Sequence, residues 1–225
     1  MRLLLTTFAA LFVATSSAFG HVVFLVPVTD GSGFDVVFND SPQPDVKVRL
    51  ELFSERPITC VAADGTVTQV STLKPADGRI RVATVATTTY SNIAYGVVMR
   101  GDPNPILLTY HPKAVRSMNR ADTVAKPVGM PLEVTATTVP EGICFTVTES
   151  GKPVANQEVQ LFQPGGSKPT IIKTDAAGRT QAFSRSGDYA ARVYRSAPDA
   201  GEHQGRRYLG VRRYATLTVR FDGGS

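Results

Sequence analysis

The stretch Gly151-Lys152-Pro153-Val154-Ala155-Asn156-Gln157-Glu158-Val159-Gln160-Leu161 decides the fold of the second half of the chain. Its first glycine can adopt the positive φ of a turn, and Val154 and Val159 are expected to face a core. A second turn follows, Thr174-Asp175-Ala176-Ala177-Gly178-Arg179, in which the aspartate can hold the turn and the glycine supplies positive φ. These features predict a β-sandwich and specify a fold rather than a chemistry.

The rest of the chain also favours short strands. Runs rich in Val, Thr, Phe, Ile and Tyr alternate with Gly, Pro, Asn and Asp, and no window has a long helical stripe. The second half predicts strands at residues 132–138, 143–149, 157–163, 170–174, 181–183, 187–194 and 214–221. The first half predicts strands at residues 21–28, 34–39, 47–53, 66–70, 79–84, 93–99 and 106–111. Asp-Gly pairs at residues 30–31, 64–65 and 77–78 predict tight turns between them.

The fold class is therefore all-β, with two antiparallel β-sandwiches in tandem. Residues 21–126 are expected to form the first sandwich and residues 132–225 the second. Residues 127–131 are expected to be a linker, because prolines and a glycine cluster there. A short helix over residues 112–124 is predicted to lead into it.

The first twenty residues resemble a secretory signal. Arg2 precedes an apolar run over residues 3–13, and Ala18 and Gly20 supply the small side chains that signal peptidase accepts before His21. The apolar run is too short to span a bilayer, which needs about 20 residues. We therefore predict residues 1–20 to be a cleaved signal peptide and the protein to be periplasmic or secreted, without a membrane span after cleavage.

Composition argues against a disordered chain, a disulfide-scaffolded miniprotein and a nucleic-acid-binding protein. The chain has 225 residues, a formal net charge of +5 and two cysteines, which is an ordinary globular composition. The charge does not indicate nucleic-acid binding. Five arginines at positions 206, 207, 212, 213 and 220 indicate a solvated strand face, with an anion-binding or envelope-surface role as the alternative. Cys60 and Cys144 are expected to be buried free thiols, with a disulfide between the halves as the alternative in an oxidising compartment.

No catalytic motif stands out. The chain lacks a Gly-x-Ser-x-Gly elbow and a glycine-rich phosphate loop, and neither cysteine has a histidine close in sequence. Tryptophan is absent, which lowers the case for a carbohydrate-binding surface. We therefore predict that the protein is not an enzyme.

The three histidines, His21, His111 and His203, are the candidate metal ligands. If cleavage leaves His21 at the terminus, its α-amine and ring nitrogen can bind one ion together, and a third nitrogen would suit copper(II) or nickel(II). His111 ends an apolar strand and His203 lies in a polar loop, while Tyr110 or Glu202 could support the site. Each histidine also has an interpretation without a metal. His21 can be terminal by accident of where the signal ends, His111 can end a strand with a capping hydrogen bond, and His203 can be a solvated loop residue.

Three hypotheses follow for the function. The first is an exported accessory protein that binds a divalent transition metal, with an envelope protein as a further partner. The second is a non-catalytic structural or interaction module of the cell envelope. The third is a copper oxidase that uses the same terminal histidine.

Two resemblances bear on these hypotheses. The turns quoted above, with Gly187-Asp188-Tyr189-Ala190-Ala191-Arg192-Val193, resemble the transthyretin-like, carboxypeptidase-regulatory-like repeat, which implies a sandwich at residues 132–225. The chain as a whole resembles an exported bacterial family of unknown function that is related to NikM-like periplasmic components of nickel and cobalt uptake. The segments that carry this resemblance are His21-Val22-Val23-Phe24-Leu25-Val26-Pro27, residues 95–102, residues 107–115, residues 200–205 and residues 213–217. This resemblance implies transition-metal handling. Some relatives carry histidine at the position of Arg213, which implies that one ligand is missing here.

Overall fold

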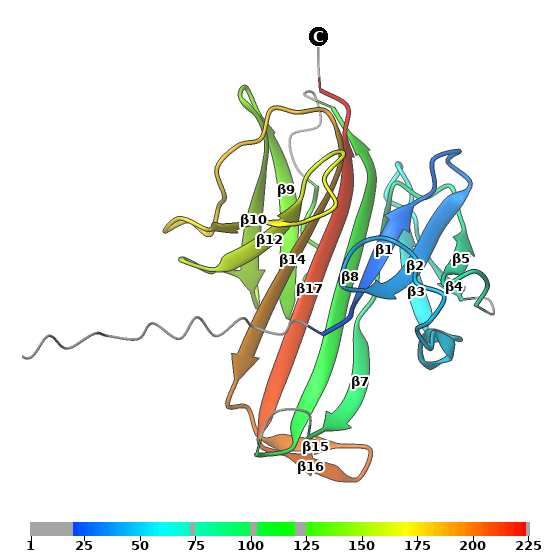
Figure 1. Cartoon of the computed structure of the whole chain (residues 1–225), viewed down its shortest axis with the longest axis vertical. Coiled ribbons are helices and arrows are strands. Elements are labelled where there is room, and N and C mark those ends of the chain that lie inside the picture. Colours follow the sequence, from blue (N-terminus) through cyan, green and yellow to red (C-terminus); the bar gives the residue numbers. More distant parts are fainter. Residues whose placement is uncertain (1–19, 73–74, 100–102, 120–124, 224–225) are drawn as a thin grey trace, which may run out of the picture.

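The computed structural model describes residues 20–72, 75–99, 103–119 and 125–223 (Figure 1). Strands dominate these residues, and the helical content within them is the 3-10 turn η1, Glu51–Phe53. This confirms the all-β sandwich class. The predicted signal peptide lies outside the described residues, except for Gly20. Among the described residues, no helix is long and apolar enough to cross a membrane.

A large central sheet organises the described part of the molecule. Its strand order is β13-β12-β14-β17-β8-β6-β3-β4, and β7 also pairs with β8. Three of these strands are unusually long, with 13 residues in β8, 11 in β14 and 12 in β17. The bounds are β3 Pro57–Val61, β4 Val67–Ser71, β6 Thr88–Tyr90, β7 Ile93–Val98, β8 Ile106–Met118, β12 Glu158–Phe162, β13 Thr170–Lys173, β14 Gly187–Ala197 and β17 Gly210–Phe221.

The two halves of the chain meet inside this sheet. β8 comes from the first half and β17 from the second, and they pair in parallel over eleven residue pairs, from Ile106 opposite Gly210 to Met118 opposite Phe221. The sequence prediction contains antiparallel pairs only, because hairpins are local and a parallel pair between distant segments leaves no local signal. The halves are therefore joined by a main-chain ladder as well as by the segment between them.

Small sheets cover the two faces of the central sheet. β1 (Val22–Pro27), β2 (Gly33–Asn39) and β5 (Ile80–Ala83) form one of them, and β9 (Leu132–Val139), β10 (Gly142–Glu149) and β11 (Lys152–Pro153) form another. They lie on opposite sides of the long strands (Figure 1). A hairpin of β15 (Gly201–His203) and β16 (Arg206–Tyr208) stands at one end.

Alternation along β17 shows how one strand serves both sandwiches. The hydroxyls of Thr216 and Thr218 donate to the carbonyls of Val23 and Leu25 in β1. Ala215 and Leu217 point the other way, into the core that β9 and β10 cover. Since successive side chains of a strand face opposite sides, β17 is buried on both faces. Each sandwich therefore uses one face of the same long strands.

The predicted turns are confirmed where they were most explicit. Gly31, Gly65 and Gly78 all adopt positive φ after their aspartates. In the second half, Asp175 Oδ1 accepts from the backbone nitrogens of Ala177 and Arg179, both at 2.8 Å. Gly178 has φ +74° there, as the turn requires.

Three predicted elements are wrong. Residues 181–183 were expected to be a strand, but they hold only an isolated bridge between Phe183 and Ile143. Residues 47–53 were expected to be a strand but contain η1, because the buried side chains are Leu50 and Phe53, three residues apart, while Leu52 is exposed. The helix expected at residues 112–124 is absent up to residue 119, because β8 continues to Met118. Residues 120–124 lie outside the described residues.

Pro112 is tolerated inside β8 because of its position. β7 pairs with β8 up to Tyr110, and β6 takes over at Lys113. The Pro112 carbonyl accepts from the Ser91 nitrogen at 3.0 Å on this side. In a strand, the nitrogen and oxygen of one residue point to the same side, so the missing N–H falls at the junction between β7 and β6.

The segment predicted as a linker, residues 127–131, wraps around a buried ion pair. Lys113 Nζ lies 2.7 Å from Glu133 Oε1, and both side chains are almost fully buried. The backbone nitrogens of Val128, Gly129 and Met130 also donate to the Glu133 carboxylate. The segment is therefore an ordered loop that binds the Glu133 side of an ion pair between the two halves. The boundary between residues 21–126 and 132–225 as folding units stays a prediction.

Candidate functional site

His21 lies immediately before β1, on the rim of a cavity of about 690 Å³. Its side chain is 38% exposed, and Nδ1 lies 3.5 Å from Asp40 Oδ1. Its ring is 5.6 Å from the ring of Phe38, and its carbonyl accepts from the Tyr110 hydroxyl at 3.4 Å. The residue is therefore anchored by its backbone, and its imidazole remains reachable from solvent.

A row of tyrosines lies across the central sheet at this cavity. Tyr194, Tyr214 and Tyr110 are direct cross-strand partners on β14, β17 and β8. Ring centroids are 5.1 Å apart for Tyr194 and Tyr214, and 5.8 Å apart for Tyr214 and Tyr110. Tyr95 of β7 extends the row, 6.0 Å from Tyr110. The side chains of Tyr95, Tyr110 and Tyr214 line the cavity.

His111 lies on the opposite face of the sheet from His21. Tyr110 contacts His21, so the next residue along β8 points away from it. The His111 ring is buried, with Nδ1 2.8 Å from Asn92 Oδ1 and Nε2 3.0 Å from Thr109 Oγ1. Burial, reinforced by the nearby Arg213 guanidinium, lowers the pKa of His111 to about 4. Both ring nitrogens are engaged, so this histidine serves packing in the described structure.

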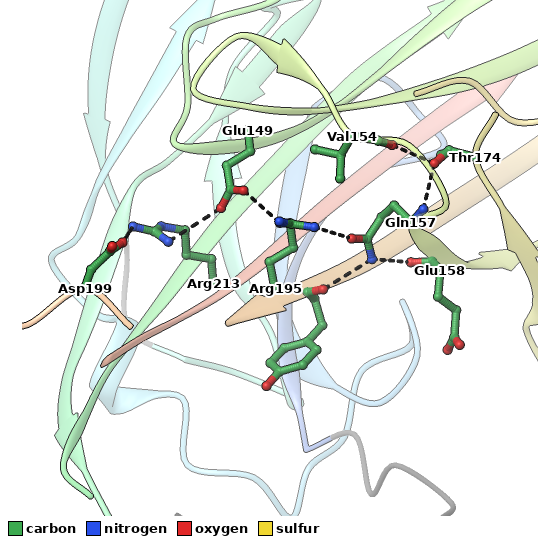
Figure 2. Close-up of polar contacts among 9 residues, drawn as sticks. Glu149, Val154, Gln157, Glu158, Thr174, Arg195, Asp199 and Arg213 are labelled. Atoms are coloured by element: carbon green, nitrogen blue, oxygen red, sulfur yellow. Dashed lines mark hydrogen bonds and ion pairs between the residues drawn. The ribbon is translucent and has the colours of Figure 1, made fainter. Parts of the chain in front are cut away.

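The residue beside it, Arg213, belongs to a charged network (Figure 2). Arg213 and Arg195 are cross-strand partners on β17 and β14, and Glu149 at the end of β10 contacts both, at 3.6 and 2.8 Å. Arg213 also reaches Asp199 at 2.8 Å, and Arg195 donates to Gln157 at 3.2 Å. The carboxylates offset the repulsion between two neighbouring arginines. Arg213 thus has an ionic role that an imidazole would fill less well.

His203 lies on the β15–β16 hairpin, opposite Arg206. It borders a separate depression of about 360 Å³, which also includes Arg56 and Gln204. The two depressions share Leu52, Tyr95 and Val98 as lining, so they are neighbours. His21 and His203 nevertheless border different depressions.

The three predicted metal ligands, His21, His111 and His203, are thus placed on different surfaces. Across residues 20–72, 75–99, 103–119 and 125–223, no group of three His, Cys, Asp or Glu side chains is arranged to hold a metal ion. The structure brings Asp40 to His21 instead. The assignment of all three histidines to one site stays a prediction that this geometry does not support.

The two cysteines are free and buried, as expected. Cys60 lies in β3 within the first core, and Cys144 lies in β10 of the second half. Burial raises the pKa of both thiols, which keeps them protonated and unreactive. The alternative of a disulfide between the halves is wrong for this structure.

Sequence reasoning missed the tyrosine row. All four tyrosines fall in predicted strands, but their alignment depends on pairing between residues 15 to 104 positions apart. The sequence offers one sign of this row, because five of the seven tyrosines, the four of the row and Tyr189, fall in predicted strands.

Comparisons with known proteins identify no family. No family model matches the chain, and no curated protein matches it. One solved structure that it is similar to is titled "Crystal structure of tetra-tandem repeat in extending region of large adhesion protein", with 16% sequence identity. The match covers 89% of this chain and 49% of that chain, with a TM-score of 0.22. The chain therefore spans about half the length of that protein chain, and the likeness is too low to carry an argument about fold or function.

Proposed function

We propose that this protein is an exported, non-catalytic module of the cell envelope that serves as a rigid structural or interaction element. The observation that carries the proposal is the parallel ladder of eleven pairs between β8 and β17. Twelve residues of β17 extend about 40 Å at about 3.3 Å per residue, through both sandwiches. Such a strand makes the two cores one mechanical body, because neither can move without breaking the shared sheet.

The buried pair Lys113–Glu133 supports the same proposal. It joins β8 to β9 across the two halves and is enclosed by the loop over residues 127–131. A buried charge pair is a weak source of net stability, but it strongly disfavours rearrangements that separate the partners. The contact therefore fixes how the second small sheet sits on the central one.

Two measurements test this proposal. Fractionation of cells that express the full chain, followed by N-terminal sequencing, is expected to find it outside the cytoplasm with His21 as its first residue. A cytoplasmic, uncleaved chain would contradict export.

Rigidity is tested with single tryptophan probes, since the chain has no tryptophan of its own. Phe53→Trp reports on the first core and Phe145→Trp on the second. In each variant, tryptophan fluorescence and circular dichroism are expected to give the same urea midpoint. Two separated transitions within one variant would show that the sandwiches are independent, and the rigid-element proposal would fail.

A second candidate function is binding of copper or nickel at His21, and one contact favours it. Asp40 Oδ1 lies 3.5 Å from His21 Nδ1, so a carboxylate stands beside the ring. If cleavage frees the backbone nitrogen of His21, the donor set is an amine, an imidazole and a carboxylate, which suits either metal. His111 does not contribute, because it lies on the other face of the sheet.

Titration of the exported chain with copper(II) and nickel(II) tests this candidate. A chain with one extra residue before His21 is expected to bind at least about tenfold more weakly, because it lacks the terminal amine at that position. Asp40→Asn is expected to weaken binding less, and His203→Asn to leave it unchanged. Equal affinity of the extended chain would refute a terminal-amine site.

A further inference from the structure

We propose that strand β4 is a self-association surface, on which β4 of a second copy of this chain pairs in antiparallel fashion about a two-fold axis at Gln69. β4 is the last strand of the central sheet, beyond β3 (Figure 1). Four of its five residues are exposed, namely Val67, Thr68, Gln69 and Ser71. The inference adds a partner to the proposed function and does not depend on it, because β4 lies outside the shared ladder of β8 and β17.

The free edge of β4 presents main-chain groups at alternate residues. At the β3–β4 hairpin, the Ala62 nitrogen donates to the Thr66 carbonyl at 2.9 Å, so these two residues form a hydrogen-bonded pair. Hydrogen-bonded pairs recur at every second residue of an antiparallel ladder, so Thr68 and Val70 bond to β3. The N–H and C=O groups of the other three residues therefore point away from β3, where no described strand pairs with them. These residues are Val67, Gln69 and Ser71.

This alternation allows two copies of β4 to pair with each other. About a two-fold axis at Gln69, that residue lies opposite its own copy, and Val67 lies opposite Ser71. All three have outward main-chain groups, so each pair can exchange both of its hydrogen bonds. On the other face of the strand, Val70 packs against the first core and Thr68 is exposed. The two-fold axis places Thr68 of each copy opposite Val70 of the other, which covers the exposed end of that core. Such a contact is isologous and closes as a dimer.

The composition of β4 favours pairing with a copy of itself. Its sequence, Val-Thr-Gln-Val-Ser, has no charge and no proline, so no like charges meet across the two-fold axis. Edge strands that stay unpaired are commonly guarded by lysine, proline or a bulge. The opposite edge of the same sheet, β13, follows Pro169 and ends at Lys173. Other edge strands of the described structure have guards of the same kinds, which are Arg81 in β5, Lys152 and Pro153 in β11, and the bulge between Ala94 and Gly96 in β7.

Sedimentation velocity of the exported chain tests the proposal. Five residues of β4 span about 16 Å at about 3.3 Å per residue, so the contact is small and the dimer is expected to be weak. The mean sedimentation coefficient is expected to rise from that of a monomer to that of a dimer between about 10 μM and about 1 mM protein. A monomer at every concentration would overturn the proposal and leave the rigid-element proposal standing.

Charged variants of Gln69 test the two-fold register. Gln69→Lys places two ammonium groups opposite each other and Gln69→Glu two carboxylates, so each variant alone is expected to dimerise about threefold more weakly than the parent. An equimolar mixture of the two variants is expected to dimerise at least as well as the parent, because a lysine then faces a glutamate. This recovery requires residue 69 to lie opposite its own copy. Ile171→Lys, at an exposed position of β13, is the matched control and is expected to dimerise like the parent.

A proline variant tests the main-chain bonds. Gln69→Pro removes an N–H that points to the free edge, so it breaks two bonds of the dimer and none to β3. It is expected to weaken dimerisation about tenfold or more. Circular dichroism must first show that this variant is folded; if it is not, the charged variants decide. The proposal is overturned if Ile171→Lys weakens the dimer as much as the Gln69 variants do, or if the mixture dimerises no better than either charged variant alone.

Discussion

Replacing His111 by asparagine is expected to remove much of the acid sensitivity of the fold. The folded protein holds this ring neutral, since burial and the neighbouring Arg213 lower its pKa to about 4. The contacts agree with a neutral ring, because Nδ1 faces the Asn92 oxygen and Nε2 faces the Thr109 hydroxyl. Asparagine keeps an amide near Nδ1 and cannot be protonated.

The sign and size of the effect follow from proton linkage. Below about pH 6.5 the unfolded chain binds a proton on His111, whereas the folded chain stays neutral until about pH 4. The unfolded state therefore holds more protons in this window, and the free energy of unfolding decreases as the pH falls. The loss is about 2 kcal/mol at pH 5 and about 3 kcal/mol at pH 4.

Urea unfolding at pH 7, 6, 5 and 4 measures this difference. At pH 7, His111→Asn is expected to be less stable than the parent, because a buried ring and one hydrogen bond are lost. The gap should narrow by about 3 kcal/mol on going to pH 4, since only the parent loses this contribution. His203→Asn on the outer hairpin is the matched control, and its gap should stay constant. A constant gap for His111→Asn would refute the argument that the fold excludes a charged ring.

Three further predictions concern the core. Lys113→Met is expected to lower the free energy of unfolding in urea by about 3–5 kcal/mol, because it leaves the Glu133 carboxylate buried without its cation. The double variant Lys113→Met with Glu133→Gln should lose less than the sum of the two single variants. Strict additivity would contradict a coupled pair. Gly178→Ala is expected to lower the free energy of unfolding by about 2–4 kcal/mol in the same assay, because φ is +74° and a Cβ would lie 2.8 Å from the Val147 carbonyl oxygen. Gly205→Ala on the β15–β16 hairpin, where a Cβ meets no atom within 4 Å, should lower it less. Cys60 and Cys144 should react with a thiol reagent only after denaturation, and a rapid reaction of either in the native protein would count against their burial.

Much of the fold could be predicted from the sequence because strands and tight turns have local signals. Alternation and Asp-Gly pairs located most strands to within a few residues, and the turn at Asp175 behaves as its sequence implies. Strands β6, β11, β15 and β16 were not predicted, because two or three residues are too few to show alternation. Strand β3 was not predicted either; it begins at a proline, which argues against a strand. The segment over residues 47–53 misled because its alternation was real in sequence while its burial has a spacing of three.

Pairing between distant strands could not be predicted from the sequence. The partnership of β8 with β17 joins Tyr110 to Tyr214, which are 104 positions apart, and no local pattern records it. The same limit applied to the candidate site. His21 could be singled out as the residue after a predicted leader, but only the register of the sheet shows that His111 faces away from it and that tyrosines lie beside it.

Two features lie on opposite faces of the same part of the long strands: the tyrosine row at the cavity beside His21, and the charged network of Arg195, Arg213 and Glu149. The length of the central strands explains their position. β1 has six residues and β9 has eight, whereas β8 and β17 have 13 and 12, so the covering sheets are shorter than the strands that they cover. The uncovered ends must present side chains that tolerate water on both faces. On one face these are Arg212 and the half-buried Tyr95 and Tyr194, which flank the buried Tyr110 and Tyr214. On the other face they are Arg195, Arg213 and their carboxylates (Figure 2). A fold built only to bury two cores needs no such surplus length. Besides the β4 edge, this end of the long strands is therefore where recognition of a ligand or partner should be sought.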